Sequence, residues 1–77
     1  MWVVGINITW GNDFFGQDTR ITKKCKKYLD AQIEMKRIHN NMLSAGWRVD
    51  AYETYNILMS VNSPQGKQEL MIWNREI

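Results

Sequence analysis

Residues 2–10 alternate between large apolar side chains and small or polar ones, and this alternation limits the secondary structure that the segment can adopt. The even positions hold Trp2, Val4, Ile6, Ile8 and Trp10, and the odd positions hold Val3, Gly5, Asn7 and Thr9. Successive side chains of a β-strand point to opposite faces. A period of two that is rich in β-branched and aromatic residues is therefore typical of a half-buried strand.

A long amphipathic helix is predicted after a glycine-containing loop at residues 11–17. Asp18 or Thr19 supplies the N-cap of this helix, which ends near Ala45, where Gly46 is the natural C′ residue. At about 100° per residue, the apolar positions gather on one broad face. From this face we expect the following side chains to pack against a sheet: Ile21, Cys25, Tyr28, Met35 and Met42.

The strand pattern returns after Gly46. Apolar residues then occupy mainly odd positions: Trp47, Val49, Ala51, Tyr55, Ile57, Met59 and Val61. A two-residue turn would reverse this parity, so the pattern favours one long bent strand, or two strands joined by an odd-length loop. A turn at residues 62–66, which holds the only proline, precedes a last strand at residues 68–74.

These elements predict an α+β fold of β-α-β-β or β-α-β-β-β order. One long amphipathic helix packs across one face of an antiparallel sheet. We expect residues 1–77 to form a single compact domain, because a chain of this length supports one small core and buries roughly 60% of its unfolded surface.

The composition favours a cytoplasmic protein without membrane association. Cys25 is the only cysteine, so no disulfide can form within the chain, and a reducing compartment is indicated. The N-terminal residues lack the basic start of a signal peptide. No apolar run approaches the length of a membrane span.

The chain offers little equipment for catalysis. Its one thiol, Cys25, and its one imidazole, His39, would lie about 21 Å apart along a helix axis and could not form a catalytic pair. The Cys and His spacing typical of a metal site is missing. We therefore expect no enzyme, no metal ion and no cofactor. We expect Cys25 to be a small buried residue, and a redox or nucleophilic role is the alternative. We expect His39 to lie at the boundary of the core, and a role in an interface or site is the alternative.

Basic residues crowd the start of the predicted helix: Arg20, Lys23, Lys24, Lys26 and Lys27. Cations at a helix N-terminus interact unfavourably with the helix dipole, so their position there indicates an anionic partner. This partner is either nucleic-acid phosphate or an acidic protein surface, and Arg37 extends the same face. The alternative is a solvated face with Asp30 and Glu34 as ion-pair partners, because a net charge of +2 does not by itself demand a polyanion.

Aromatic residues are more numerous than so small a core can easily enclose, with four tryptophans in the chain. One helix covers only one side of a sheet, so the other side is expected to form an open, partly apolar surface. The residues that we expect to bind a partner, on this surface and in the first loop, are Phe14, Phe15, Tyr52, Leu58, Met71 and Trp73. The alternatives are that Leu70 and Ile72 face this surface in place of Met71 and Trp73, and that the two phenylalanines pack on the start of the helix. A homodimer through the same surface is an alternative use of it.

The sequence analysis therefore predicts a small, non-catalytic protein-binding module or inhibitor. Its size, its aromatic content and its lack of catalytic residues give it a resemblance to small virus- or phage-encoded accessory proteins that block host protein complexes. In this interpretation the basic residues steer the molecule to an acidic partner. The alternative is a nucleic-acid-binding domain that uses the basic helix face.

Overall fold

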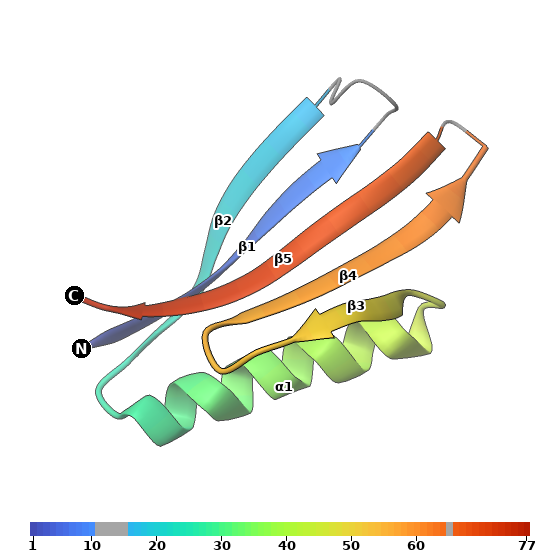
Figure 1. The fold of residues 1–77 in the computed structure, drawn as a ribbon. Coiled ribbons are helices and arrows are strands. Elements are labelled where there is room, and N and C mark those ends of the chain that lie inside the picture. Colours follow the sequence, from blue (N-terminus) through green and yellow to red (C-terminus); the bar gives the residue numbers. More distant parts are fainter. Residues whose placement is uncertain (11–15, 65) are drawn as a thin grey trace.

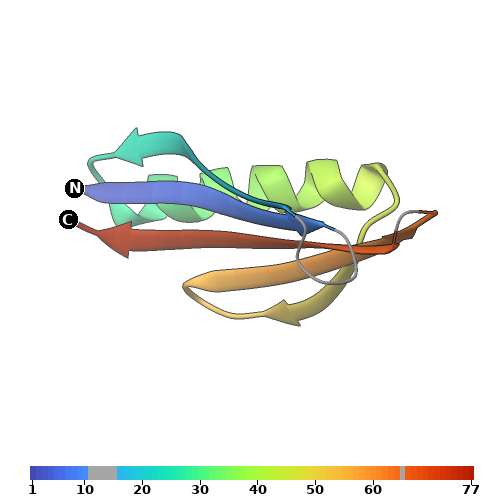
Figure 2. The same ribbon diagram turned by 90° about the horizontal axis from the view of Figure 1, so that it is seen from above.

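The computed structural model describes residues 1–10, 16–64 and 66–77. Its elements are β1 (Trp2–Trp10), β2 (Gly16–Cys25), α1 (Tyr28–Ser44), β3 (Arg48–Tyr52), β4 (Asn56–Ser63) and β5 (Gly66–Glu76). The strands form one antiparallel, five-stranded sheet in the order β2-β1-β5-β4-β3, and α1 lies across one face of it (Figures 1 and 2). The predicted α+β fold class is confirmed.

The first and last strands of the chain pair at the centre of this sheet. In β1 and β5, Ile6 is opposite Ile72 and Ile8 is opposite Leu70. The chain ends therefore lie side by side at one end of the molecule (Figure 1). The pattern of even positions predicted for residues 2–10 places these isoleucines on the side of the core.

The core lies between this sheet face and α1. The sheet contributes Val4, Cys25, Ile57, Met59, Leu70 and Ile72, and the helix contributes Ala31, Met35 and Ile38. The helical residues recur every three or four positions, so they form one stripe along α1. Met35 is among the largest fully buried side chains. Removing a side chain of this size from a core typically costs about 2–5 kcal/mol.

The helix ends where the sequence predicts. Gly46 adopts a φ of 95°, a left-handed conformation that glycine reaches without steric cost. The Gly46 N–H donates to the Leu43 carbonyl and the Trp47 N–H to the Met42 carbonyl, both at 3.0 Å, which is a Schellman motif. No helix in the described part of the chain combines the length and apolar character that a membrane crossing needs.

The predicted start of the helix at Asp18 or Thr19 is wrong, because strand β2 occupies residues 16–25. A central strand has hydrogen-bonding groups on both edges, and β2 satisfies those of β1 that β5 leaves unpaired. The β-branched residues Thr19, Ile21 and Thr22 also favour a strand. In consequence Ile21 is 51% exposed instead of lying in the core.

Other expected core positions have mixed outcomes. Cys25 and Met35 are buried, as predicted, although Cys25 comes from the end of β2 rather than from the helix. Met42 packs at the edge of the core, whereas Tyr28 is more exposed than expected.

The segment after Gly46 forms two strands joined by an odd-length loop, which confirms one of the two predicted alternatives. The Thr54 carbonyl in this loop accepts hydrogen bonds from Gln32 Nε2 at 2.9 Å and from Asn74 Nδ2 at 3.3 Å. These bonds connect the loop to both α1 and β5. At the next turn the Ser63 hydroxyl donates to the Gly66 carbonyl at 2.6 Å, where a turn was expected.

The different positions of Met35 and Ile21 can be tested by stability measurements. Met35→Asp should unfold the protein, because it leaves an unpaired carboxylate in the core at a cost of at least about 4 kcal/mol, comparable to the total stability of so small a domain. Ile21→Asp should cost less than about 1 kcal/mol, because its side chain meets water. Urea denaturation followed by circular dichroism compares the two variants. A well-folded Met35→Asp protein would contradict the observed packing of α1.

Candidate functional site

The face of the sheet turned away from α1 is the candidate site, and we call it the open face. Its rows follow from the strand register: Asn7 is opposite Met71, which is opposite Leu58, and the next row contains Ile21, Gly5 and Trp73. These side chains alternate with those of the core. No element of the described residues packs against them (Figure 2).

Trp73 is fixed on the open face by Gly5 and Asn7. Gly5 and Trp73 are direct cross-strand partners, and a Cβ atom built on Gly5 would overlap the indole ring. The indole N–H donates to Asn7 Oδ1 at 3.0 Å, and the guanidinium of Arg75 lies 5.4 Å from the ring centroid. The ring therefore covers the glycine and has a defined position before any partner arrives.

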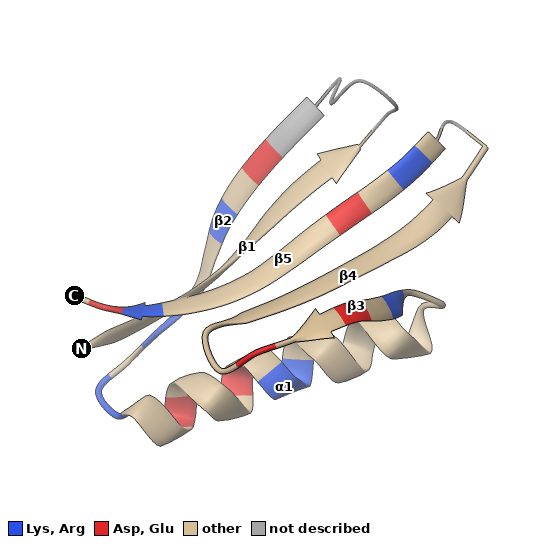
Figure 3. Cartoon of the chain, viewed as in Figure 1, with Lys and Arg blue, Asp and Glu red and all other residues tan. Residues whose placement is uncertain are grey.

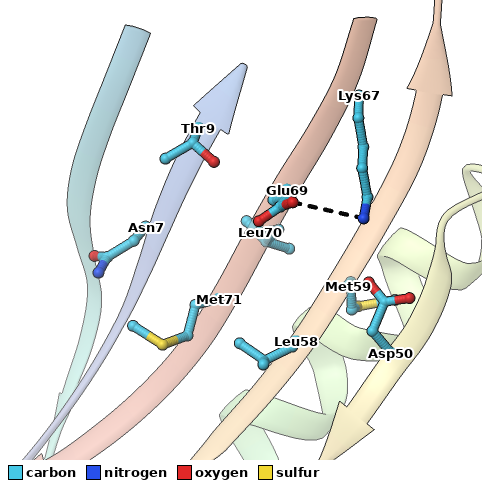
Figure 4. A pocket seen from close by; sticks show the side chains of 9 residues that line it. All are labelled: Asn7, Thr9, Asp50, Leu58, Met59, Lys67, Glu69, Leu70 and Met71. Atoms are coloured by element: carbon cyan, nitrogen blue, oxygen red, sulfur yellow. Dashed lines mark ion pairs between the residues drawn. The ribbon is translucent and has the colours of Figure 1, made fainter. Parts of the chain in front are cut away.

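Two shallow hollows flank the row of Asn7 and Met71. One has a volume of about 470 Å³ and is lined by Thr9, Leu58 and Glu69 besides this row (Figure 4). The other, of about 460 Å³, lies toward Ile21, Trp73 and Arg75. Because the two hollows share Asn7 and Met71, they form one continuous shallow depression across β2, β1, β5 and β4.

The far end of the first hollow carries charges of both signs. Lys67 Nζ lies 3.6 Å from Glu69 Oε1 (Figure 4). Asp50 lines this end as well, and the buried hydroxyl of Ser60 has no hydrogen-bond partner among the described residues. The Ser60 hydroxyl is the largest cause that lowers the pKa of Asp50, against the opposing effect of burial. Arg48, whose Nε lies 3.4 Å from Asp50 Oδ1, lowers the pKa further. This end of the site therefore brings acidic and basic side chains together in pairs.

Three of the predicted apolar site residues come together on the open face: Leu58, Met71 and Trp73. Tyr52 was expected beside them, and this placement is wrong. The register of β3 shifts between Val49 and Ala51, so the following residues change faces. Tyr52 packs edge-on against His39 of α1, with ring centroids 5.3 Å apart. The predicted loop residues Phe14 and Phe15 lie outside the described residues.

The predicted basic helix face does not form. Arg20 and Lys23 lie on β2, Lys26 lies in the connection that follows, Lys27 is the N-cap of α1, and only Arg37 lies within the helix (Figure 3). The cause is the same strand that replaces the first part of the expected helix. Arg20 pairs with Asp18 at 2.7 Å, and Arg37 pairs with Glu34.

Glu34 and Arg37 form an ion pair at the edge of the core. Arg37 donates from Nε to Oε1 at 2.7 Å and from Nη2 to Oε2 at 2.9 Å, while the Glu34 side chain is only 5% exposed. These bonds lower the pKa of Glu34 below its ordinary value of 4.5, against the opposing effect of burial. The nearby Thr22 and Lys23 of β2 lower the pKa further. Arg37 is thus occupied within the fold.

The two residues considered for catalysis lie apart. Cys25 is a buried free thiol, and the His39 ring packs on Tyr52 with its Nδ1 at 3.0 Å from Asn40 Oδ1. Within residues 1–10, 16–64 and 66–77, no three His, Cys, Asp or Glu side chains are close enough together to hold a metal ion.

No protein-family model matches this sequence, and no significant match was found among curated proteins or solved structures. The function therefore has to be inferred from the surfaces of the molecule.

The position of Trp73 over Gly5 can be tested by a double-mutant cycle. Gly5→Ala should destabilise the protein by about 1–3 kcal/mol, because the new methyl group displaces the indole and breaks its bond to Asn7. In a Trp73→Leu background the same substitution should be nearly neutral. Urea denaturation gives the four unfolding free energies. An equal cost of Gly5→Ala in both backgrounds would show that the ring does not cover the glycine.

The Glu34 and Arg37 pair predicts a specific pH dependence. Glu34→Gln should lower the free energy of unfolding by about 1–2 kcal/mol at pH 7. Because the folded-state pKa of Glu34 is lowered, its charge contributes fully above pH 4.5, and the contribution is lost as the pH falls through the folded-state value. The difference between wild type and variant, measured by denaturation between about pH 7 and about pH 3, should therefore narrow in acid. Lys36→Gln is the control, and its smaller effect should stay constant. A constant Glu34→Gln difference would contradict the assigned pair.

Proposed function

We propose that this protein is a non-catalytic binding module that engages a protein partner through the open face. The observation that carries the proposal is the fixed indole of Trp73 beside the apolar side chains of Ile21, Leu58 and Met71, on a sheet face without a covering element in the described chain. Tryptophan is prominent among the residues that dominate binding energy at protein interfaces. A ring that is already in place loses little conformational entropy on binding.

The shape and chemistry of the surface favour a protein over a small molecule. The two hollows are shallow, lie next to each other and extend over four strands, whereas sites for small ligands are enclosed and bury most of the ligand. Polar groups surround the apolar centre, with Thr9 and Glu69 on one side and Thr19 and Arg75 on the other. An apolar centre with a polar rim is the usual arrangement of a protein interface.

The outer face of α1 is a weaker candidate for the same function. Leu29 and Ile33, four residues apart on the helix, are 67% and 59% exposed. Neither makes the kind of contact that fixes Trp73, and single exposed aliphatic residues are common on protein surfaces. This pair therefore supplies matched control positions.

A small accessory protein that blocks a protein complex of its host is the particular form of this function that we propose. A 77-residue chain with a preformed binding face suits a role that needs occupancy of a surface rather than turnover. The buried free thiol of Cys25 is compatible with the cytoplasmic setting that this role implies.

The open face can be tested by charge insertion at its centre. Leu58→Glu and Met71→Glu should each reduce capture of the partner at least about tenfold while the protein stays folded, because the new carboxylate would be desolvated at the interface. Ile33→Glu places the same charge on the outer face of α1 and should capture the partner like wild type. Affinity capture from nuclease-treated host lysate, with quantitative mass spectrometry, compares the three variants.

Sedimentation of the same proteins separates two uses of the open face. If wild type and Ile33→Glu are dimers and the open-face variants are monomers, the partner is a second copy of the chain. Equal capture by all four proteins, with no difference in sedimentation, would exclude the open face as the binding surface.

A further inference from the structure

Three aromatic rings from three separate elements meet at the end of the molecule where the chain ends lie. The Trp2 ring of β1 is 4.9 Å from the Tyr28 ring of α1 in an edge-on arrangement. Tyr55, in the loop between β3 and β4, lies 6.5 Å from both, with its plane within 5° of that of Trp2. Tyr28 is 38% exposed and Tyr55 is 52% exposed. The cluster is thus partly open to solvent and lies outside the open face.

Three lysines lie next to these rings along the chain, at the same end of the molecule. Cys25, which is paired with Trp2, lies between Lys24 and Lys26, and Lys27 directly precedes Tyr28. All three lysines are exposed, and none of them forms an ion pair with another described residue. Figure 3 shows this basic segment at the end of β2 and in the connection to α1. We call the three rings together with Lys24, Lys26 and Lys27 the basic aromatic end.

Acidic groups do not neutralise the basic aromatic end. The carboxylates of this region are Asp30 in the first turn of α1, Glu53 in the loop before Tyr55, and Glu76 opposite Trp2. Against them stand the three lysines, and none of them lies within ion-pair distance of a carboxylate in the described part of the chain. Lys24, Lys26 and Lys27 are therefore available to an anionic ligand.

We propose that the basic aromatic end binds single-stranded nucleic acid. The lysines contact phosphates, and the exposed rings of Tyr28 and Tyr55 stack on unpaired bases. This combination of a cationic surface with clustered aromatic faces is the general mode of sequence-tolerant single-strand binding. A duplex offers no free base faces to the rings, so the proposed ligand is an unpaired strand. This site is separate from the open face and does not depend on the function proposed for it.

The experiment measures binding of a fluorescently labelled 12-nucleotide oligothymidylate by anisotropy over a series of salt concentrations. For wild type, the logarithm of the affinity should fall linearly with the logarithm of the salt concentration, by about 0.7 for each phosphate contact. The triple variant Lys24→Gln, Lys26→Gln, Lys27→Gln should bind at least about tenfold more weakly at low salt and with a flatter salt dependence. Tyr55→Leu should lose about tenfold in affinity with an unchanged salt slope, because it removes stacking and no charge.

A matched control removes the same number of charges elsewhere. Arg20→Gln, Lys36→Gln and Lys67→Gln together leave the basic aromatic end intact and should keep wild-type affinity within about threefold. Thermal unfolding checks that each variant is folded. The open-face variant Met71→Glu should bind the oligonucleotide like wild type, so failure of one proposal is distinguishable from failure of the other.

Three outcomes would overturn the proposal. The first is no binding of the oligonucleotide at low salt, and the second is an equal loss of affinity in the triple variant and in the matched control. The third is wild-type affinity of Tyr55→Leu together with equal binding of heparin, a polyanion without bases. That third result would assign the lysines to a general anionic partner, such as an acidic protein, and the rings to the fold alone.

Discussion

The pairing of β1 with β5 determines both the core and the open face. These two central strands come from opposite ends of the chain, and a single register aligns them. In this register Ile6 meets Ile72 on the side of α1, and one position away Gly5 meets Trp73 on the other side. A slip of one residue would move the core residues of one strand to the solvent side. Helix α1 would then lose the apolar surface on which it packs, and Trp73 would lose its contact with Gly5.

The open face and the core are therefore coupled through Gly5. A side chain at this position would contact the open face only, yet its absence allows a large aromatic ring to lie close to the backbone of β1. Glycine within a strand is usually unfavourable, because it loses much conformational freedom and packs no side chain. Here the Trp73 ring supplies the missing packing, and its bond to Asn7 fixes the ring. Most of the remaining stability has to come from the other face, where Met35 and Ile72 are buried.

Local patterns in the sequence predicted those parts of the fold that depend on one segment at a time. The alternation of residues 2–10 and the end of the helix at Gly46 follow from parity and from turn chemistry. Parity also places Met71 and Trp73 on one face of their strand, whereas the pairing with β4 decides that this face is shared with Leu58. Strand β2 could not be predicted in this way, because its apolar positions Ile21 and Cys25 also fit a helical face. The β-branched residues Thr19, Ile21 and Thr22 favour the strand weakly, and the need of a central β1 for a second partner decides between the two interpretations. That need depends on the remote strand β5.

Two features of the candidate sites were not predicted from the sequence, because they depend on contacts between segments that are far apart in the chain. Tyr52 left the open face because the register of β3 shifts before it, and the one local signal of the shift is Asp50, a residue type that is uncommon in strands. The cluster of Trp2, Tyr28 and Tyr55 joins three elements far apart in the chain.

Apart from Arg37, which pairs with Glu34, the basic residues that were predicted to form one helix face divide into two groups with different physical explanations. Arg20, Lys23 and Lys24 lie on β2, an edge strand, where charged side chains hinder unwanted pairing with other strands. Lys26 and Lys27 lie after its last residue, so edge protection does not explain them. Lys27 occupies the N-cap of α1 without making a side-chain cap, a place where Ser, Thr or Asp would stabilise the helix. A cation there also interacts unfavourably with the helix dipole. Lys27 is therefore a poor choice for the stability of α1, and the binding role that we propose for the basic aromatic end would account for its position.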